Sequence, residues 1–207
     1  MSKPLFIATA LLAALIFSNC EKYDSKNGGS LTIEVKVQNG ENFNNVINEV
    51  RAIGYLDSNQ QVIIASAPFE NGGFKITLPK KIDERLLEPM YLENYYIQPS
   101  LKVSNRNVNS TVLDVLYGYK NNAYVSIFQV YGENVADNNK IYEIFFTYVD
   151  KDVKITGTQY EYDNIFYIDN DLKKGWNVVY SYANGNELTV TTKKPNIEVI
   201  WYFVYDR

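Results

Sequence analysis

The side chains that could perform chemistry in this chain are of few kinds. The sequence contains no histidine and a single cysteine, Cys20. Without histidine, the Ser–His and Cys–His nucleophile–base pairs and the histidine-containing zinc sites are excluded. No Gly-rich phosphate loop of the Walker or Rossmann type is present, and no βαβ pattern would support one. The chemistry left to this chain belongs to carboxylates, hydroxyls and aromatic rings.

Carboxylates are the remaining catalytic groups. The chain holds 24 Asp and Glu residues, and two carboxyl groups can hydrolyse a glycosidic bond when one is protonated and the other is ionised. Spacing along the sequence singles out no such pair. We therefore predict a protein without catalytic residues and keep a glycoside hydrolase-like activity as the alternative.

One short stretch, Asp169-Asn170-Asp171, has the composition of a calcium-binding turn. Calcium prefers several oxygen ligands, and two nearby carboxylates supply some of them. Asp163 and Asn164 would join these ligands if the strand between them and the turn doubled back. Asn and Asp are also the ordinary residues of turns, and the EF-hand pattern is absent. We therefore predict a turn without metal or cofactor, with calcium at Asp169 and Asp171 as the alternative.

Tyrosine is the most abundant candidate for binding, with 18 copies beside 10 Phe and two Trp. Exposed tyrosine rings stack on sugars and anchor protein interfaces. Binding residues are often found in irregular segments. The binding residues that we expect are therefore those of a connector between two β units: Tyr91, Tyr95 and Tyr96.

A second group of tyrosines, Tyr160, Tyr162 and Tyr167, lies beside acids on what is expected to be one strand. Cross-strand aromatic pairs that simply build a sheet are the alternative explanation for these residues. Trp176 and Trp201 stand within apolar strand segments and are expected in the core.

The elements that must position these residues are β-strands. Residues 31–37 alternate between apolar and polar, which places one face of a strand in a core. Further strands are expected at 50–56, 62–67 and 74–78. This order, with its "GGFKITLP" stretch, resembles the transthyretin-like and carboxypeptidase-regulatory-like modules. The resemblance implies a small immunoglobulin-like β-sandwich over residues 31–79, and it implies no activity.

The rest of the chain predicts a second β unit. Residues 80–100 are expected to be a connector with at most two helical turns before Pro89. Residues 101–207 form the second antiparallel unit, with strands at 112–119, 124–131, 141–149, 153–156, 159–168, 177–182, 188–192 and 198–205. The last strand is nearly all apolar and is expected to be buried on both faces. The predicted fold class is all-β, with two small antiparallel β-sandwich units.

The N-terminus predicts where the protein is located. Lys3 precedes an apolar stretch, residues 5–17, that suits a secretory signal peptide and is too short to span a membrane. The "FSNC" that follows resembles the lipobox of bacterial lipoproteins, in which cleavage precedes a cysteine that is then acylated. The resemblance implies a signal peptide over residues 1–19 and lipid attachment at Cys20. Acylation would also account for an unpaired cysteine in an exported protein.

The C-terminal third carries another resemblance. Its "LKKGWNVVYSY", "TTKKPN" and "WYF" stretches are similar to a pattern of uncharacterised Bacteroides-type lipoproteins. The resemblance implies a lipid-anchored protein of the cell envelope, at the outer membrane, and brings no activity with it. Polar residues 20–30 are expected to form a flexible tether between the lipid and the folded body.

Charge limits the partners. Removal of residues 1–19 leaves 19 Lys and Arg residues against 24 Asp and Glu residues, and no basic patch is visible. A nucleic-acid partner is therefore not expected. The expected function is non-catalytic binding at a membrane, to a glycan or to another envelope protein. The alternatives are the carboxylate enzyme and a structural subunit whose apolar C-terminal strand pairs with a partner's sheet.

Lipid attachment at Cys20 is directly testable. Metabolic labelling with a clickable palmitate should mark the full chain, because two or three acyl chains hold a protein on a membrane stably. A chain that stays unlabelled would instead be a soluble domain of the periplasm.

Overall fold

The computed structural model of this chain describes residues 22–24, 29–56, 60–90, 98, 100–134 and 141–204. The predicted signal peptide, Cys20 and the connector tyrosines Tyr91, Tyr95 and Tyr96 lie outside the described residues. Within them, nearly all of the regular secondary structure is β-strand, and the helices are two short 3-10 turns. The prediction of an all-β, sandwich-like fold is confirmed.

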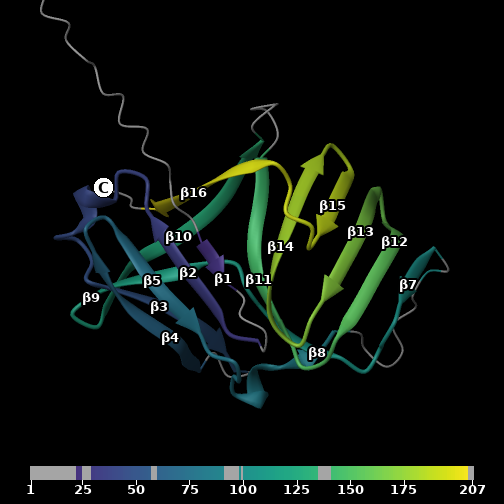
Figure 1. The fold of residues 1–207 in the computed structure, drawn as a ribbon, viewed down its shortest axis with the longest axis horizontal. Helices are drawn as coiled ribbons and strands as arrows, with labels where there is room; N and C mark the ends of the chain where they lie inside the picture. The colour runs from purple at the N-terminus through teal and green to yellow at the C-terminus, as the bar shows by residue number, and fades with distance from the viewer. Residues whose placement is uncertain are drawn as a thin grey trace, which may run out of the picture.

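The strands are distributed over the whole described chain (Figure 1). Those before residue 100 are β1 (Lys22–Asp24), β2 (Leu31–Lys36), β3 (Glu49–Tyr55), β4 (Gln61–Glu70), β5 (Gly73–Leu78) and β6 (Glu88–Pro89). Those after it are β7 (Leu101–Val103), β8 (Asn109–Leu113), β9 (Leu116–Lys120), β10 (Ala123–Asn134), β11 (Ile141–Val149), β12 (Val153–Glu161), β13 (Asn164–Leu172), β14 (Gly175–Asn184), β15 (Glu187–Thr191) and β16 (Ile197–Val204). The 3-10 turns are η1 (Gly40–Phe43) and η2 (Glu84–Leu86).

The strands follow one continuous hydrogen-bonded order, β1-β2-β5-β4-β3-β9-β10-β11-β14-β15-β13-β12-β7. β16 adds to β10, and β8 pairs with both β11 and β6. Among the described strands the pairs are antiparallel apart from β13 and β15, which run parallel. Strands of the two predicted units pair with one another where β3 meets β9. Part of the expected tether, β1, pairs with β2.

One half of the molecule curls back on itself. The path from β2 through β5, β4, β3, β9, β10 and β16 returns to the end of β2, where Val37 forms a backbone bridge with Trp201. The Gln38 N–H also donates to the Trp201 carbonyl at 2.8 Å. The inward side chains, which include Ile33 and Phe128, form the larger core. Alternate residues of each strand point into it, as the period of two requires.

The other half is an open sheet of β11, β14, β15, β13, β12 and β7, which fans away from the curled half (Figure 1). One face of β11 and β14 packs into the larger core through Phe146 and Trp176. A smaller apolar cluster, which includes Val153 and Leu172, covers the opposite face of the sheet. The β12–β13 hairpin is therefore buried on one face only.

Two predicted local structures are wrong, and both concern this hairpin. Residues 159–168 are two strands, because the chain reverses at Tyr162-Asp163 between β12 and β13. Residues 169–171 are the interior of β13 and not a turn. The turn was missed because Tyr162 has a φ of 52°, a value that turn patterns assign to Gly or Asn.

Other differences are smaller. The stretch expected as one strand over 112–119 divides into β8 and β9, and the short helix before Pro89 is reduced to η2. β16 is buried on one face and not on both, because Glu198 and Val204 are exposed while Trp201 is buried. The core placement of Trp176 and Trp201 is confirmed, at 3% and 2% exposure.

Trp201 should be among the most destabilising positions to truncate. Its ring packs against Phe74 at 5.5 Å and Phe146 at 6.2 Å between centroids, so Trp201→Ala would leave a cavity between the two halves. We expect the free energy of unfolding to fall by about 3–5 kcal/mol, measured by urea denaturation. Val204→Ala, at an exposed position of the same strand, is the control and should change it by less than about 0.5 kcal/mol.

Candidate functional site

The site is sought among the described residues. The predicted lipid site, Cys20, and the connector tyrosines Tyr91, Tyr95 and Tyr96 lie outside them, so these remain predictions. The second tyrosine group is described in full. Tyr160, Tyr162 and Tyr167 are 55%, 98% and 41% exposed, so these rings are not part of a core.

Strand register places a row of tyrosines and threonines on one face of the open sheet. Tyr142 lies opposite Tyr182, Tyr182 opposite Thr189, Thr189 opposite Tyr167, and Tyr167 opposite Thr158. Directly paired residues point to the same side of a sheet. Tyr160, two residues after Thr158, shares that side. We call this surface the tyrosine face; its members are Tyr142, Thr158, Tyr160, Tyr167, Tyr182 and Thr189.

Contacts within the tyrosine face hold its rings in place. The rings of Tyr142 and Tyr182 are 5.2 Å apart between centroids and inclined by 33°. The negative charge of Glu187 raises the pKa of Tyr167, with burial and Tyr160 contributing, and the two side chains are hydrogen-bonded. Thr158 and Thr189 lie directly opposite Tyr167 on the two neighbouring strands and flank its ring.

The backbone beneath Tyr160 is clamped from the strand edge. The Gln98 side chain donates from Nε2 to the Tyr160 carbonyl at 2.5 Å and accepts from the Tyr160 N–H at 2.9 Å. Ser100 Oγ donates to the Thr158 carbonyl at 2.7 Å. These bonds satisfy edge groups that would otherwise be open to a further strand, and they fix the strand that carries the exposed rings.

Tyr162 occupies the tip of the β12–β13 hairpin. It is the first residue of a two-residue turn, since Glu161 pairs with Asn164, and it has a φ of 52°. A positive φ at this position is normally supplied by glycine, and a bulky residue adopts it at a cost. Strained residues of this kind concentrate at functional sites. A fully exposed aromatic ring is thus kept where the backbone favours glycine.

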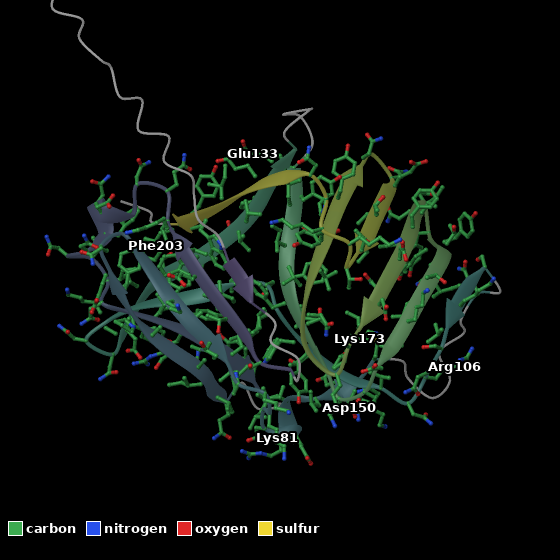
Figure 2. All side chains as sticks on the ribbon, viewed as in Figure 1. Lys81, Arg106, Glu133, Asp150, Lys173 and Phe203 are labelled. Carbon is green, nitrogen blue, oxygen red and sulfur yellow. The ribbon has the colours of Figure 1, made fainter. Side chains whose placement is uncertain are left out.

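The aspartates of the predicted turn lie on the same side as the tyrosine face. Asp169 is ion-paired with Lys193 at 2.5 Å and Asp171 with Lys173 at 2.8 Å, and Lys173 is visible over the open sheet in Figure 2. The Lys173 ammonium lowers the pKa of Asp171. Among the described residues there is no group of three or more His, Cys, Asp or Glu that could hold a metal.

A second polar site lies on the curled half and has a structural explanation. Arg51 donates to Glu49 at 2.6 Å and to Asn122 at 2.5 Å, and its guanidinium stands 4.1 Å above the ring of Tyr119. The hydrogen bond from Arg51 lowers the pKa of Glu49. These contacts tie the β9–β10 turn to β3. A pocket of about 430 Å³ beside them is lined mainly by such turn and strand residues.

A third site is a pocket of about 320 Å³ at one end of the sheets, lined by Lys80, Lys81, Lys174, Tyr148 and Gly175. Lys81 and Asp150 mark this end in Figure 2. The Tyr148 hydroxyl donates to the Lys80 carbonyl at 3.2 Å, and Trp176 Nε1 donates to the Pro79 carbonyl at 3.0 Å. The buried polar groups here join the end of β5 to the open sheet.

The shifted carboxyl groups do not suit general-acid catalysis. The pKa values of Glu49, Asp83 and Asp171 are all lowered, in each case mainly by a hydrogen bond from a neighbouring cation. A glycosidase acid requires a raised pKa so that it is protonated near neutrality. These three carboxylates are therefore placed to accept hydrogen bonds and not to donate a proton.

Comparison with known proteins gives no relative from which a role could be transferred. No protein-family profile matches the sequence, and no significant match is found among curated proteins or solved structures. Within the described part of the chain, no helix has the length and apolar character needed to cross a membrane.

Replacement of Tyr162 by glycine should make the protein more stable. Tyr162→Gly relieves the cost of a positive φ at a site where the ring is 98% exposed, and part of that gain is lost to the greater freedom of glycine in the unfolded chain. We expect a gain of about 0.5–1 kcal/mol, seen as a rise in Tm of about 1–4 °C by calorimetry.

The matched control is Tyr160→Gly, which places glycine inside an extended strand and should lower Tm. If Tyr162→Gly lowered Tm as well, the ring would be stabilising the fold, and the view of Tyr162 as a strained, exposed residue would be wrong.

Proposed function

We propose that this chain is a lipid-anchored, non-catalytic binding protein of a bacterial cell envelope, and that the tyrosine face binds a glycan. The observation that carries the proposal is that two exposed rings, Tyr160 and Tyr167, share one sheet face with the two threonines that lie directly opposite Tyr167.

The geometry of the rings suits a sugar chain. Tyr160 and Tyr167 are diagonal neighbours across the β12–β13 pair, because Thr158 lies directly opposite Tyr167. Diagonal cross-strand side chains stand roughly 7–8 Å apart. An aromatic ring offers an apolar surface to the C–H groups of a sugar and, in tyrosine, a hydroxyl at its rim. Two rings on one rigid sheet can therefore contact successive parts of one extended glycan.

Polar groups around the rings can meet the hydroxyls of a sugar. Thr158 and Thr189 stand on either side of Tyr167, and the Glu187 carboxylate is hydrogen-bonded to its hydroxyl. Hydroxyls both donate and accept hydrogen bonds, whereas a carboxylate only accepts. An apolar surface edged with such groups favours a ligand that is itself apolar on one side and polar at its edges.

The surface is arranged for binding and not for turnover. The acids on this side of β13 are ion-paired, Asp169 with Lys193 and Asp171 with Lys173. A retaining or inverting glycosidase uses two carboxyl groups facing the scissile bond, one of them protonated. The non-catalytic function is therefore proposed ahead of the carboxylate enzyme. Lipid attachment at Cys20, proposed from the lipobox resemblance, would hold the binding face at an envelope membrane.

The proposal is tested with the full chain purified in neutral detergent and applied to a glycan array. We expect binding to at least one glycan class without release of reducing ends. The double variant Tyr160→Ala/Tyr167→Ala should weaken that binding by about tenfold to a hundredfold, because each aromatic contact contributes roughly 0.5–1.5 kcal/mol.

Tyr124→Ala is the matched control, since Tyr124 is an equally exposed tyrosine on β10, outside the tyrosine face. It should bind like the unaltered chain. Release of reducing ends that a single Asp or Glu substitution abolished would replace the proposal with the enzyme. Glycan binding that persisted in the double variant would move the site elsewhere on the protein.

A further inference from the structure

We infer that the glycan is acidic, bearing carboxylate or sulfate groups, and that Lys102 and Lys154 bind those groups at the edge of the tyrosine face. The inference rests on the proposed glycan-binding function and names its ligand class. It comes from the charges that the sheet places beside the exposed rings.

Strand register places both lysines on the same side of the sheet as the tyrosine face. Lys154 lies opposite Asp171 in the β12–β13 pair, and Lys102 lies opposite Thr156 in the β7–β12 pair. Residues 154, 156, 158 and 160 alternate along β12 and therefore share one side. From Lys154 to Tyr160 this row spans about 20 Å at roughly 3.3 Å per residue. A glycan lying along β12 would meet the lysines at one end and the ring of Tyr160 at the other.

Among the described lysines on the tyrosine-face side of β7, β12 and β13, Lys102 and Lys154 form no ion pair with a described carboxylate. Lys173 and Lys193 are occupied by Asp171 and Asp169. Within the part of the chain that the structure describes, neither Lys102 nor Lys154 has a carboxylate within 4.0 Å, and both residues are exposed. The charge of Lys154 still contributes to the lowered pKa of Asp171. Two ammonium groups thus remain available to an anionic ligand.

The charge differs between the two parts of this surface, negative at Glu187 and positive at the β7–β12 edge. Glu187, the acid that raises the pKa of Tyr167, is on β15, which β13 and β12 separate from β7. Arg106 follows β7 and adds a positive charge at the β7 edge (Figure 2). An acidic group would be repelled near Glu187 and attracted near Lys102 and Lys154. The anionic groups of the glycan are therefore assigned to the β7–β12 edge.

Overall charge does not explain such a preference. The whole chain has a formal net charge of −4, which disfavours the approach of polyanions in general. Attraction at this edge is local, because charges separated by more than about 8–10 Å are largely screened at physiological salt. The preference should accordingly depend on the two lysines and weaken as salt is added.

The experiment compares acidic glycans with neutral partners of the same backbone. The probes are polygalacturonate with its fully methyl-esterified form, and dextran sulfate with dextran. Affinities for the full chain in neutral detergent are measured by biolayer interferometry at low and high NaCl. At low salt we expect at least one acidic polymer to bind more tightly than its neutral partner, by about fivefold to tenfold, and high salt should remove most of the difference.

The variants distinguish the glycan-binding function from the preference for acidic glycans. Lys102→Gln/Lys154→Gln should remove the preference for the acidic polymer and leave binding to the neutral partner unchanged. Lys81→Gln, which removes a positive charge outside the tyrosine face, in the pocket that Tyr148 also lines, is the control and should keep the preference. Far-UV circular dichroism confirms that each variant is folded.

Three outcomes would count against the proposals. Equal binding of acidic and neutral partners would overturn the acidic ligand and leave the glycan function standing. A preference that survived in Lys102→Gln/Lys154→Gln would overturn the assignment of the two lysines. Absence of binding to every probe, together with an array on which Tyr160→Ala/Tyr167→Ala changes nothing, would overturn the glycan function itself.

Discussion

The packing of Trp201 between two sets of strands is the contact on which the rest of the structure depends. Its ring meets Phe74 from the beginning of the fold and Phe146 from the open sheet, and its backbone meets Val37. A residue near the C-terminus thereby joins the first long strand to the last one. Contacts between distant parts of the chain cost loop-closure entropy. Burial of apolar surface must offset that cost. The near-continuous apolar character of β16 supplies that surface.

The larger core covers only part of one face of the open sheet, and the rest of that face, over β12 and β13, carries the exposed rings. The larger core covers one face of β11 and β14, and the smaller cluster covers the opposite face of β12 and β13. The tyrosine face is therefore supported from behind and exposed in front, and Gln98 clamps its outer strand. Rigid support beneath exposed rings reduces the entropy lost when a ligand binds. The same arrangement permits Tyr162 to keep a costly backbone conformation at the hairpin tip.

Part of this architecture could be predicted from local pattern. Alternation in residues 31–37 and 74–78 predicts strands that the structure confirms, and the apolar context of Trp176 and Trp201 predicts their burial. The β12–β13 hairpin could not be predicted from the sequence. Its turn contains Tyr162, and tyrosine is not a residue typical of turns, whereas Asp169-Asn170-Asp171 has the composition of a turn but lies inside a strand. In β13, Asn170 is buried, while Lys173 and Lys193 compensate the charges of the aspartates. Lys193 comes from the segment after β15, and local propensity does not detect such a distant partner.

The sequence by itself determined the all-β class and the lack of histidine chemistry, because short-range alternation and composition are enough for these two, and the resemblance of its FSNC stretch to a lipobox implies a lipid anchor at Cys20. It also identified Tyr160, Tyr162 and Tyr167 as a group, without deciding between a binding surface and sheet packing. Only the tertiary structure decided that these rings are exposed, that threonines flank Tyr167, and that Lys102 and Lys154 share their face. Which side of a strand meets solvent depends on register and on what covers the sheet, and both are set by pairing between residues distant in the chain.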